Sequence, residues 1–202
     1  MWRGVVMNKI VAIAVSTGGP KALQQVIPRL PTDLDAPVIL VQHMLEGFTK
    51  DLANRLTQLS MIEVKEAAEH EQIKKGCVYL ARGGRHLNYA EGVGLGTLYY
   101  SDQPNRQGVK PCADYMYESL VNSPFDEIVC VVMTGMGHDA TEGILHLEKK
   151  KKIFVIAQDQ KTSVVYGMPR SIIEAEKADR IVPLDQIAQE IILRVGVRKD
   201  GR

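Results

Sequence analysis

Cysteine pairs, net charge and long apolar runs are all scarce in this chain of 202 residues, and each scarcity excludes a class of protein. The formal net charge is only +1, so no broad basic surface indicates nucleic-acid binding and no acidic excess indicates disorder. No stretch approaches the roughly 20 apolar residues of a membrane-spanning helix, and residues 1–9 contain no signal-peptide core. We therefore expect a soluble protein that inserts into no membrane and binds no nucleic acid.

The cysteines and histidines show no pattern of metal ligands. Cys77, Cys112 and Cys130 form no C-x-x-C pair, and Cys77 and Cys130 lie in apolar strand patterns typical of small core residues. The five histidines form no H-x-x-x-H motif and no cluster with cysteine. We expect no metal site and no bound cofactor. An odd number of unpaired cysteines is typical of a reducing compartment, so we predict a cytoplasmic location.

What the chain does contain is the alternation of an α/β protein. Apolar residues make up 45% and charged residues 24%, which suits a single globular domain over 1–202 with residues 1–9 as an N-terminal extension. Short apolar runs predict strands buried on both faces, at 10–15, 37–42, 128–134, 153–157 and 180–183. Apolar residues at helical spacing predict helices at 20–30, 49–60, 111–122, 139–150, 162–177 and 185–195.

This alternation predicts a doubly wound, mostly parallel sheet with helices on both faces. The segment 77–101 breaks the rhythm, because three short strand-like runs at 77–81, 86–90 and 93–101 are separated by glycine-rich turns. We expect an antiparallel meander there. The lysine run 149–152 follows a helical pattern, where its charges suit the negative end of the helix dipole, so we interpret it as a solvated helix end.

Three polar side chains follow three of the predicted strands. Ser16 follows the strand 10–15, His43 follows 37–42, and Asp139 lies just beyond 128–134. The carboxyl ends of parallel strands meet at one edge of a sheet, where ligands of open α/β sheets bind. A hydroxyl, an imidazole and a carboxylate at one edge are the groups of a nucleophilic triad, in which the imidazole activates the hydroxyl and the carboxylate orients the imidazole. The sequence thus predicts an esterase-type hydrolase with Ser16 as nucleophile.

The glycine-rich turns after these strands suit the same chemistry. Gly18 and Gly19 leave space around the Ser16 hydroxyl, and the helix that follows directs its first N–H groups at the turn. The Met136 amide, between two glycines, is a candidate second donor to an oxyanion. Each residue also has a bland alternative: Ser16 and Asp139 as helix N-caps and His43 as a satisfied histidine at a strand end. His138 is a rival base, disfavoured by its tight glycine loop.

A second hypothesis comes from another class of protein. Gly135, Gly137 and Ala140 fit the G-x-G-x-x-A dinucleotide-binding pattern, and Asp159 lies about twenty residues later, where a ribose-binding carboxylate would stand. That fingerprint normally occupies the first strand-to-helix turn, and it leaves Ser16 and His43 unexplained.

Six motifs, in order along residues 10–193, resemble the catalytic domain of bacterial chemotaxis protein-glutamate methylesterases. They are AVSTGGP at 14–20, VQHM at 41–44, GFT at 47–49, TGMG at 134–137, AQD at 157–159 and VYGMP at 165–169. The resemblance implies a triad of Ser16, His43 and Asp139, with Thr17 and Met136 assisting around the oxyanion and imidazole. It also implies hydrolysis of γ-glutamyl methyl esters on the cytoplasmic helices of chemoreceptors, and deamidation of receptor glutamines in many relatives.

The sequence departs from the family at several places. Ala140 stands where glycine is common, and Cys112 stands where serine is usual. The family usually carries a phospho-receiver domain ahead of this one, whereas about nine residues precede the first strand here. Two alternatives follow: the sequence is a trimmed piece of a longer chain, or it is a stand-alone esterase without phosphorylation control, for which a separate regulatory protein is a candidate partner. A third hypothesis is an inactive module that only binds receptors.

Overall fold

A computed structural model describes residues 8–198 of the chain, so the predicted extension 1–9 lies mostly outside the described residues. Its centre is a parallel sheet of seven strands in the order β10-β9-β8-β1-β2-β5-β3. The strands are β1 Lys9–Val15, β2 Val38–Gln42, β3 Glu63–Glu66, β5 Cys77–Leu80, β8 Glu127–Val132, β9 Lys152–Gln158 and β10 Arg180–Val182. The predicted parallel sheet is confirmed.

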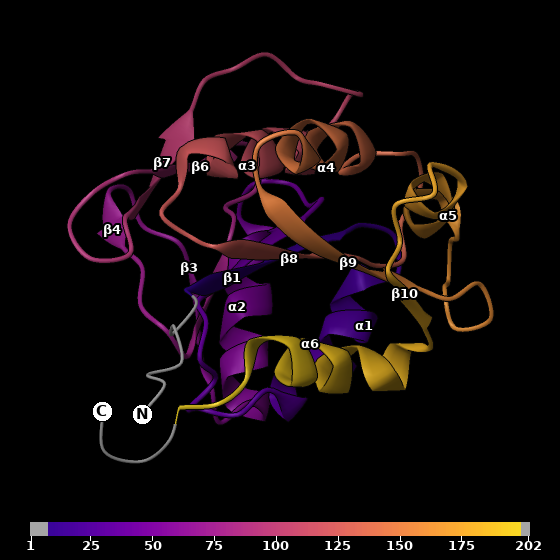
Figure 1. Ribbon diagram of the computed structural model, residues 1–202, viewed down its shortest axis with the longest axis horizontal. Helices are drawn as coiled ribbons and strands as arrows, with labels where there is room; N and C mark the ends of the chain where they lie inside the picture. Colours follow the sequence, from indigo (N-terminus) through magenta and orange to yellow (C-terminus); the bar gives the residue numbers. More distant parts are fainter. Residues whose placement is uncertain (1–7, 199–202) are drawn as a thin grey trace, which may run out of the picture.

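Helices cover both faces of this sheet, as the doubly wound fold requires (Figure 1). One face carries α1 (Gly19–Val26), α2 (Phe48–Leu59) and α6 (Ile187–Val195), together with the 3-10 turns Ile27–Arg29 and Leu184–Gln186. The other carries α3 (Ala113–Ser119), α4 (Thr141–Glu148) and α5 (Gly167–Glu174), with the 3-10 turn Leu120–Asn122. The central strands β1, β2, β5 and β8 therefore lie between two layers of helices and are buried along almost their whole length, whereas the edge strands β3 and β10 keep exposed residues.

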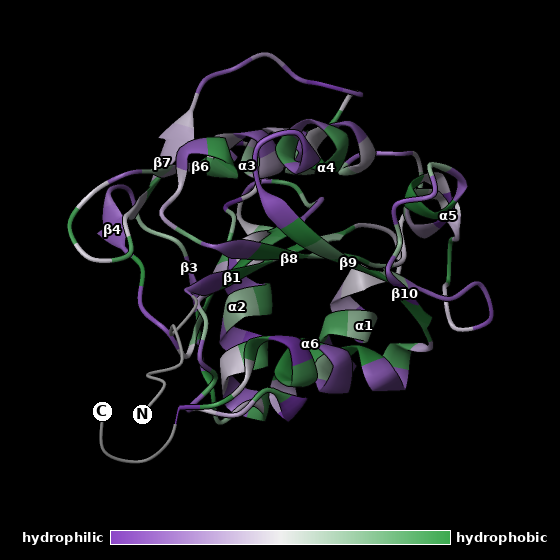
Figure 2. Cartoon of the chain, in the orientation of Figure 1, coloured by the Kyte–Doolittle hydropathy of each residue, from purple (hydrophilic) through white to green (hydrophobic). Residues whose placement is uncertain are grey.

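The strand residues alternate between the two resulting cores. In β1, Ile10, Ala12 and Ala14 pack under α3 and α4, whereas Val11 and Ile13 pack against α1 and α6. A strand buried on both faces must be apolar at every position, which is why the central strands read as unbroken hydrophobic runs. Figure 2 shows this pattern, with hydrophobic colour concentrated in the sheet and on the inner sides of the helices.

The predicted meander is only partly correct. A second sheet of three antiparallel strands contains β6 (His86–Ala90) and β7 (Thr97–Ser101), joined by β4 (Glu71–Gln72) at the edge. The run at 77–81 does not belong to it: β5 pairs in parallel between β2 and β3. All four β5 residues are buried, which is the burial of a central strand and not of a half-exposed meander strand. The short polar strands β3 and β4 carry no apolar run that predicts them.

Four predicted helices begin later in the structure, and the largest shift is that of the helix predicted from 162. The helix predicted from 162 begins at Gly167, because Thr162 hydrogen-bonds its amide and hydroxyl to the Asp159 carboxylate and closes a local turn. The helix predicted from 139 begins at Thr141. Across residues 8–198, we find no helix that combines the length and apolar character needed to span a bilayer.

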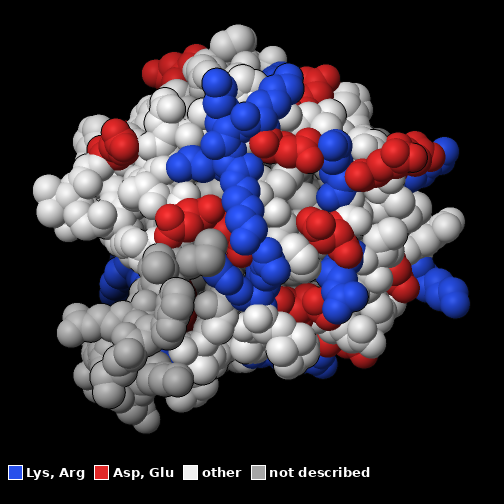
Figure 3. Space-filling model, in the orientation of Figure 1, with Lys and Arg blue, Asp and Glu red and all other residues white. Residues whose placement is uncertain are grey.

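Basic side chains form a band across the face in Figure 3, with acidic side chains among them. The lysine run 149–152 begins at the C-cap of α4, as the dipole argument predicts. Two of its members also have internal partners: Lys151 donates to the carbonyl of Phe125 at 3.3 Å, and Lys152 lies 3.3 Å from the buried carboxylate of Glu127. These contacts anchor the run to the sheet.

Candidate active site

Ser16 and His43 are brought together by the register of neighbouring strands. β1 ends at Val15 and β2 ends at Gln42, and these two residues are paired in the parallel ladder. The ladder continues for one more hydrogen bond, from the His43 amide to the Val15 carbonyl at 3.1 Å. Ser16 and His43 are thus the first residues beyond adjacent strand ends, as the sequence predicted.

The loop that follows β8 and carries Asp139 approaches Ser16 from the other side of β1. The Ser16 amide donates to the Thr134 carbonyl at 2.9 Å. A Cβ atom at Gly135 would lie 2.8 Å from the Ser16 Cβ and 2.3 Å from the Met168 sulfur, so only glycine allows this approach. The glycine between the β8 end and Met136 is therefore required by close packing against Ser16.

His43 and Asp139 form a direct pair. The His43 Nε2 lies 2.6 Å from Asp139 Oδ2, and the two side chains are only 10% and 3% exposed. An ionised carboxylate only accepts hydrogen bonds, so Nε2 carries the proton and donates it. This leaves Nδ1 as the imidazole nitrogen whose lone pair is available to take a proton from a neighbouring hydroxyl.

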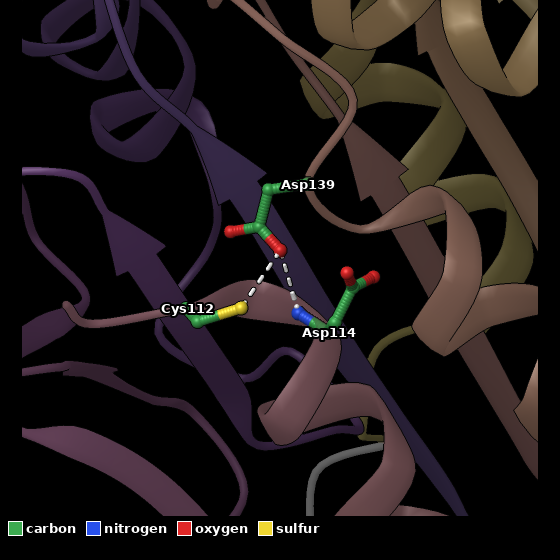
Figure 4. A group of neighbouring side chains, drawn as sticks. All are labelled: Cys112, Asp114 and Asp139. Atoms are coloured by element: carbon green, nitrogen blue, oxygen red, sulfur yellow. Dashed lines mark hydrogen bonds between the residues drawn. The ribbon is translucent and has the colours of Figure 1, made fainter. Parts of the chain in front are cut away.

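Asp139 is held by more donors than His43 alone. Its oxygens also accept the backbone N–H groups of Ala113 at 2.7 Å, Asp114 at 2.9 Å and Ala140 at 2.9 Å. The Cys112 thiol donates to Oδ1 at 3.1 Å, a contact drawn in Figure 4 with that of the Asp114 amide. Burial by itself raises the pKa of Asp139, but the hydrogen bond and charge of His43, with these N–H groups, lower it to about 2.

These contacts correct the interpretation of Asp139 as a cap of the helix that follows it. Ala113 and Asp114 are the first residues of α3, so Asp139 caps α3, while the N-cap of α4 is Ala140. The exchange is reciprocal, because Asp114 Oδ1 accepts the Gly143 amide in the first turn of α4 at 2.7 Å. Each helix is thus capped by a carboxylate from the segment of the other, which locks Asp139 in place.

The backbone conformation at Ala140 explains why glycine is common at this position among the proteins that the sequence resembles. Its φ is 90°, in the left-handed region where a side chain is strained and glycine is not. A glycine is common at this position among the proteins the sequence resembles, and the conformation accounts for that preference.

Cys112, Asp114 and Asp139 also form the one group of potential metal ligands found among residues 8–198, with ligand atoms within 4.8 Å of one another. Asp139 Oδ1 accepts from Cys112, Asp114 and Ala140, and Oδ2 accepts from His43 and Ala113. A cation would have to displace these donors. The arrangement fits a carboxylate that orients an imidazole better than it fits a metal ligand.

Asp114 has the opposite electrostatics to Asp139. Burial and the nearby charge of Asp139 raise its pKa to about 6, against the opposing effects of the Gly143 amide and Arg106. The folded state therefore keeps a proton on Asp114 that the unfolded chain loses near pH 4. Stability from this group is present below about pH 4 and is lost as pH rises through 6.

Replacing Asp114 with asparagine should remove this pH dependence. Asparagine can still accept the Gly143 amide, and the exposed Gln107 carboxamide, which now donates to Asp114, can rotate to accept instead. Relative to wild type, the free energy of unfolding of Asp114→Asn should rise by about 2 kcal/mol between pH 4 and pH 7. Urea unfolding at both pH values measures it. A difference that stays constant with pH would contradict the raised pKa of Asp114.

The two predicted oxyanion positions lie on the loops that carry Ser16 and Asp139. Thr17 and Met136 are both exposed, and neither backbone amide donates a hydrogen bond within the described part of the chain. Free N–H groups beside a nucleophile are what an oxyanion site needs. The rival base His138 is exposed on the same loop.

The dinucleotide hypothesis finds no support in this geometry. The loop at Gly135 is closed by the segment that precedes and begins α5: the Gly135 amide donates to the Val165 carbonyl at 2.9 Å, and the Met168 amide donates to the Gly135 carbonyl at 2.9 Å. One oxygen of the Asp159 carboxylate accepts both the amide and the hydroxyl of Thr162, so it closes a local turn. Gly135, the first glycine of the pattern, serves packing against Ser16.

Sequence reasoning missed two polar residues that support the candidate triad. The sequence marks Cys112 only as a departure from the resembling family, and Gln42 only as the end of a strand. One signal was available for Gln42, because an amide that closes an apolar run and stands next to His43 must be buried and needs hydrogen-bond partners.

The comparisons with known proteins identify a family and agree with the fold. A family model described as CheB methylesterase matches residues 11–191. The protein-glutamate methylesterase/protein-glutamine glutaminase 1 of Syntrophomonas wolfei is 48% identical, over 92% of this chain and 54% of the relative. The protein-glutamate methylesterase/protein-glutamine glutaminase of Bacillus subtilis is 45% identical, over 91% of this chain and 52% of the relative. The chain thus spans about half the length of these relatives. The crystal structure of the Thermotoga maritima CheB methylesterase catalytic domain matches with a TM-score of 0.89 at 39% identity, covering 94% of this chain and 100% of that one.

Proposed function

Because the chain belongs to the CheB methylesterase family, we propose that it hydrolyses γ-methyl esters of glutamate residues in proteins, releasing glutamate and methanol. The observation that carries the proposal is the buried His43–Asp139 pair at 2.6 Å, next to a serine at the adjacent strand end. Ser16 is the nucleophile, His43 the base and Asp139 the residue that orients it.

The reaction follows from the protonation of the imidazole. With Nε2–H donated to Asp139, Nδ1 takes the Ser16 proton as the hydroxyl oxygen attacks the ester carbonyl. The Thr17 and Met136 amides donate to the oxyanion of the tetrahedral intermediate. His43 then returns the proton to the departing methoxide, methanol leaves, and a glutamyl ester of Ser16 remains. Water, activated by the same imidazole, hydrolyses that ester and regenerates the serine.

The electrostatics support this cycle. The pKa of Asp139 is lowered to about 2, so the carboxylate stays ionised wherever the folded enzyme works and stabilises the imidazolium that forms in each step. The same machinery suits deamidation of glutamine, in which ammonia replaces methanol as the leaving group. The relatives' names include that second activity.

Large exposed apolar side chains on the segments that follow β2, β8 and β9 support a protein substrate. Leu45 is 76% exposed, Phe48 60%, Met136 69% and Val164 67%. Apolar side chains concentrated around a site are typical of a surface that another protein covers. We propose that methylated cytoplasmic helices of chemoreceptors dock here, which agrees with the predicted cytoplasmic location. The single domain over 1–202 and a separate regulatory protein stay predictions.

Substituting Phe48 with serine tests the docking surface. Loss of a buried phenyl contact, worth about 1.5–3 kcal/mol, should raise KM for a methylated receptor fragment at least tenfold. The rate at which a small fluorophosphonate modifies Ser16 should not change, because the exposed Phe48 is no part of the Ser16–His43–Asp139 triad. Met61→Ser, at a side chain that is 85% exposed beyond the end of α2, is the matched control. An unchanged KM in Phe48→Ser would exclude this surface.

The proposed function is tested by methanol release from methylated chemoreceptor fragments incubated with the wild-type protein. We expect release that is catalytic and saturable. A folded protein that binds the fragments without releasing methanol would instead be the inactive receptor-binding module. A melting temperature raised by NAD or NADP would revive the dinucleotide hypothesis, since a ligand of the folded state stabilises it.

A further inference from the structure

Gln42 is a polar side chain buried directly behind the candidate triad. It is the last residue of β2 and is only 2% exposed. By the alternation of the strand it shares a face with Val38 and Leu40, which pack against the α1 and α2 layer. His43 follows on the opposite face, the side of α3 and Asp139. Gln42 therefore reaches the catalytic loops from behind, through their backbones.

Its carboxamide contacts the nucleophile and the base at once. The Nε2 group donates to the Ser16 carbonyl at 3.0 Å and to the His43 carbonyl at 2.9 Å. Carbonyl oxygens only accept, so the nitrogen and not the oxygen of the amide must face them. Both N–H bonds of the carboxamide are thereby used, one on each catalytic residue.

The space for this amide is built into the nucleophile turn. A Cβ atom at Gly19 would lie 2.0 Å from the Gln42 Oε1, so this glycine makes room for the carboxamide. Oε1 itself has no hydrogen-bond partner in the described part of the chain. A buried amide with an unpartnered oxygen costs stability, which indicates that the two donated bonds have another use.

We propose that Gln42 is a positioning residue that fixes the distance between Ser16 and His43. The inference rests on the proposed function, because it assigns a role within the same triad. Beside this side chain, the ladder bond from the His43 amide to the carbonyl of Val15, the residue before Ser16, links the two strand ends. The Gln42 amide adds a rigid second connection at the point where the ladder ends.

The expected consequence is kinetic. Proton transfer from Ser16 to His43 requires an alignment in which an error of about 1 Å costs about 10²-fold in rate. The amide contacts no substrate, so its loss should lower kcat and the reactivity of the serine while leaving KM unchanged. A role in packing alone would lower stability and leave kcat unchanged.

Two substitutions separate these possibilities. Gln42→Met keeps the shape of the side chain and removes both donors. Gln42→Glu keeps the shape, and its buried carboxyl group, when protonated at acid pH, restores one donor. The control is Asn88→Leu, because Asn88 is 5% exposed on β6 and its amide also donates two hydrogen bonds, to Tyr99 and Gln103. Methanol release, fluorophosphonate modification of Ser16 and melting temperature are measured for each protein.

For Gln42→Met we expect kcat and the modification rate to fall by about 10- to 100-fold with KM within twofold of wild type. Asn88→Leu should lose a similar amount of stability and keep its kcat. For Gln42→Glu, activity relative to wild type should be higher at pH 5.5 than at pH 8. A kcat of Gln42→Met equal to that of the control overturns the proposal. If Gln42→Met does not fold, a pH-independent ratio for Gln42→Glu overturns it.

The modification rate also separates this inference from the proposed function. A wild-type protein that releases no methanol but reacts with fluorophosphonate, more slowly in Gln42→Met, would disprove the substrate and support the positioning role. A wild-type protein with neither activity would overturn both.

Discussion

Replacing Ser16 with alanine is expected to lower methanol release by about 10⁴-fold or more, the scale seen when a triad nucleophile is removed. The residual rate would come from the oxyanion donors and substrate binding alone. Methanol release from methylated receptor fragments measures the effect, and an active Ser16→Ala protein would eliminate the triad.

The fold should survive this substitution. The Ser16 backbone is held by its amide to Thr134 and by its carbonyl, which accepts from Gly19 and Gln42. None of these bonds uses the hydroxyl, so the melting temperature should stay within a few degrees of wild type. The matched control is Ser101→Ala, which removes the hydroxyl of a serine on β7 that donates to Gln103. This variant should keep full activity.

Replacing Asp139 with asparagine should have the second largest effect on rate, and it should also lower stability. The carboxylate holds His43 in the tautomer with Nε2 protonated, and loss of that constraint in a triad costs about 10⁴-fold in kcat. Asparagine keeps the volume of the side chain, so the loss would report charge and tautomer. A kcat within tenfold of wild type would contradict the orienting role of Asp139.

The stability effect of Asp139→Asn follows from its partners. Every partner of the Asp139 carboxylate is a hydrogen-bond donor. One oxygen accepts from His43 and Ala113, and the other accepts from Cys112 and two backbone amides. Whichever way the carboxamide is turned, its NH₂ group faces at least two of these donors. Each buried donor left without an acceptor costs about 1–3 kcal/mol, so we expect a loss of several kcal/mol in urea unfolding. Asp114→Asn, which keeps an acceptor for Gly143, should lose far less at neutral pH.

Much of the fold could be predicted because it depends on local patterns. β1, β2, β8 and β9 are apolar at nearly every position, and only a strand between two helical layers requires that. β5 has the same apolar character, but its four residues lie next to glycine-rich turns that are equally typical of a hairpin. The pairing of β5 with β2 and β3 depends on contacts between segments that are distant in the sequence, and the residues around β5 do not indicate it.

The sequence by itself determined that Ser16, His43 and Asp139 lie beyond the carboxyl ends of three strands, because parallel strands share one edge. Only the tertiary structure decided how they are held there. Two donors to Asp139 come from the start of α3, about 25 residues away. The Gln42 amide, which donates to the Ser16 and His43 carbonyls, comes from the opposite face of the sheet. Hydrogen bonds between such distant residues follow from packing, and packing depends on the whole chain.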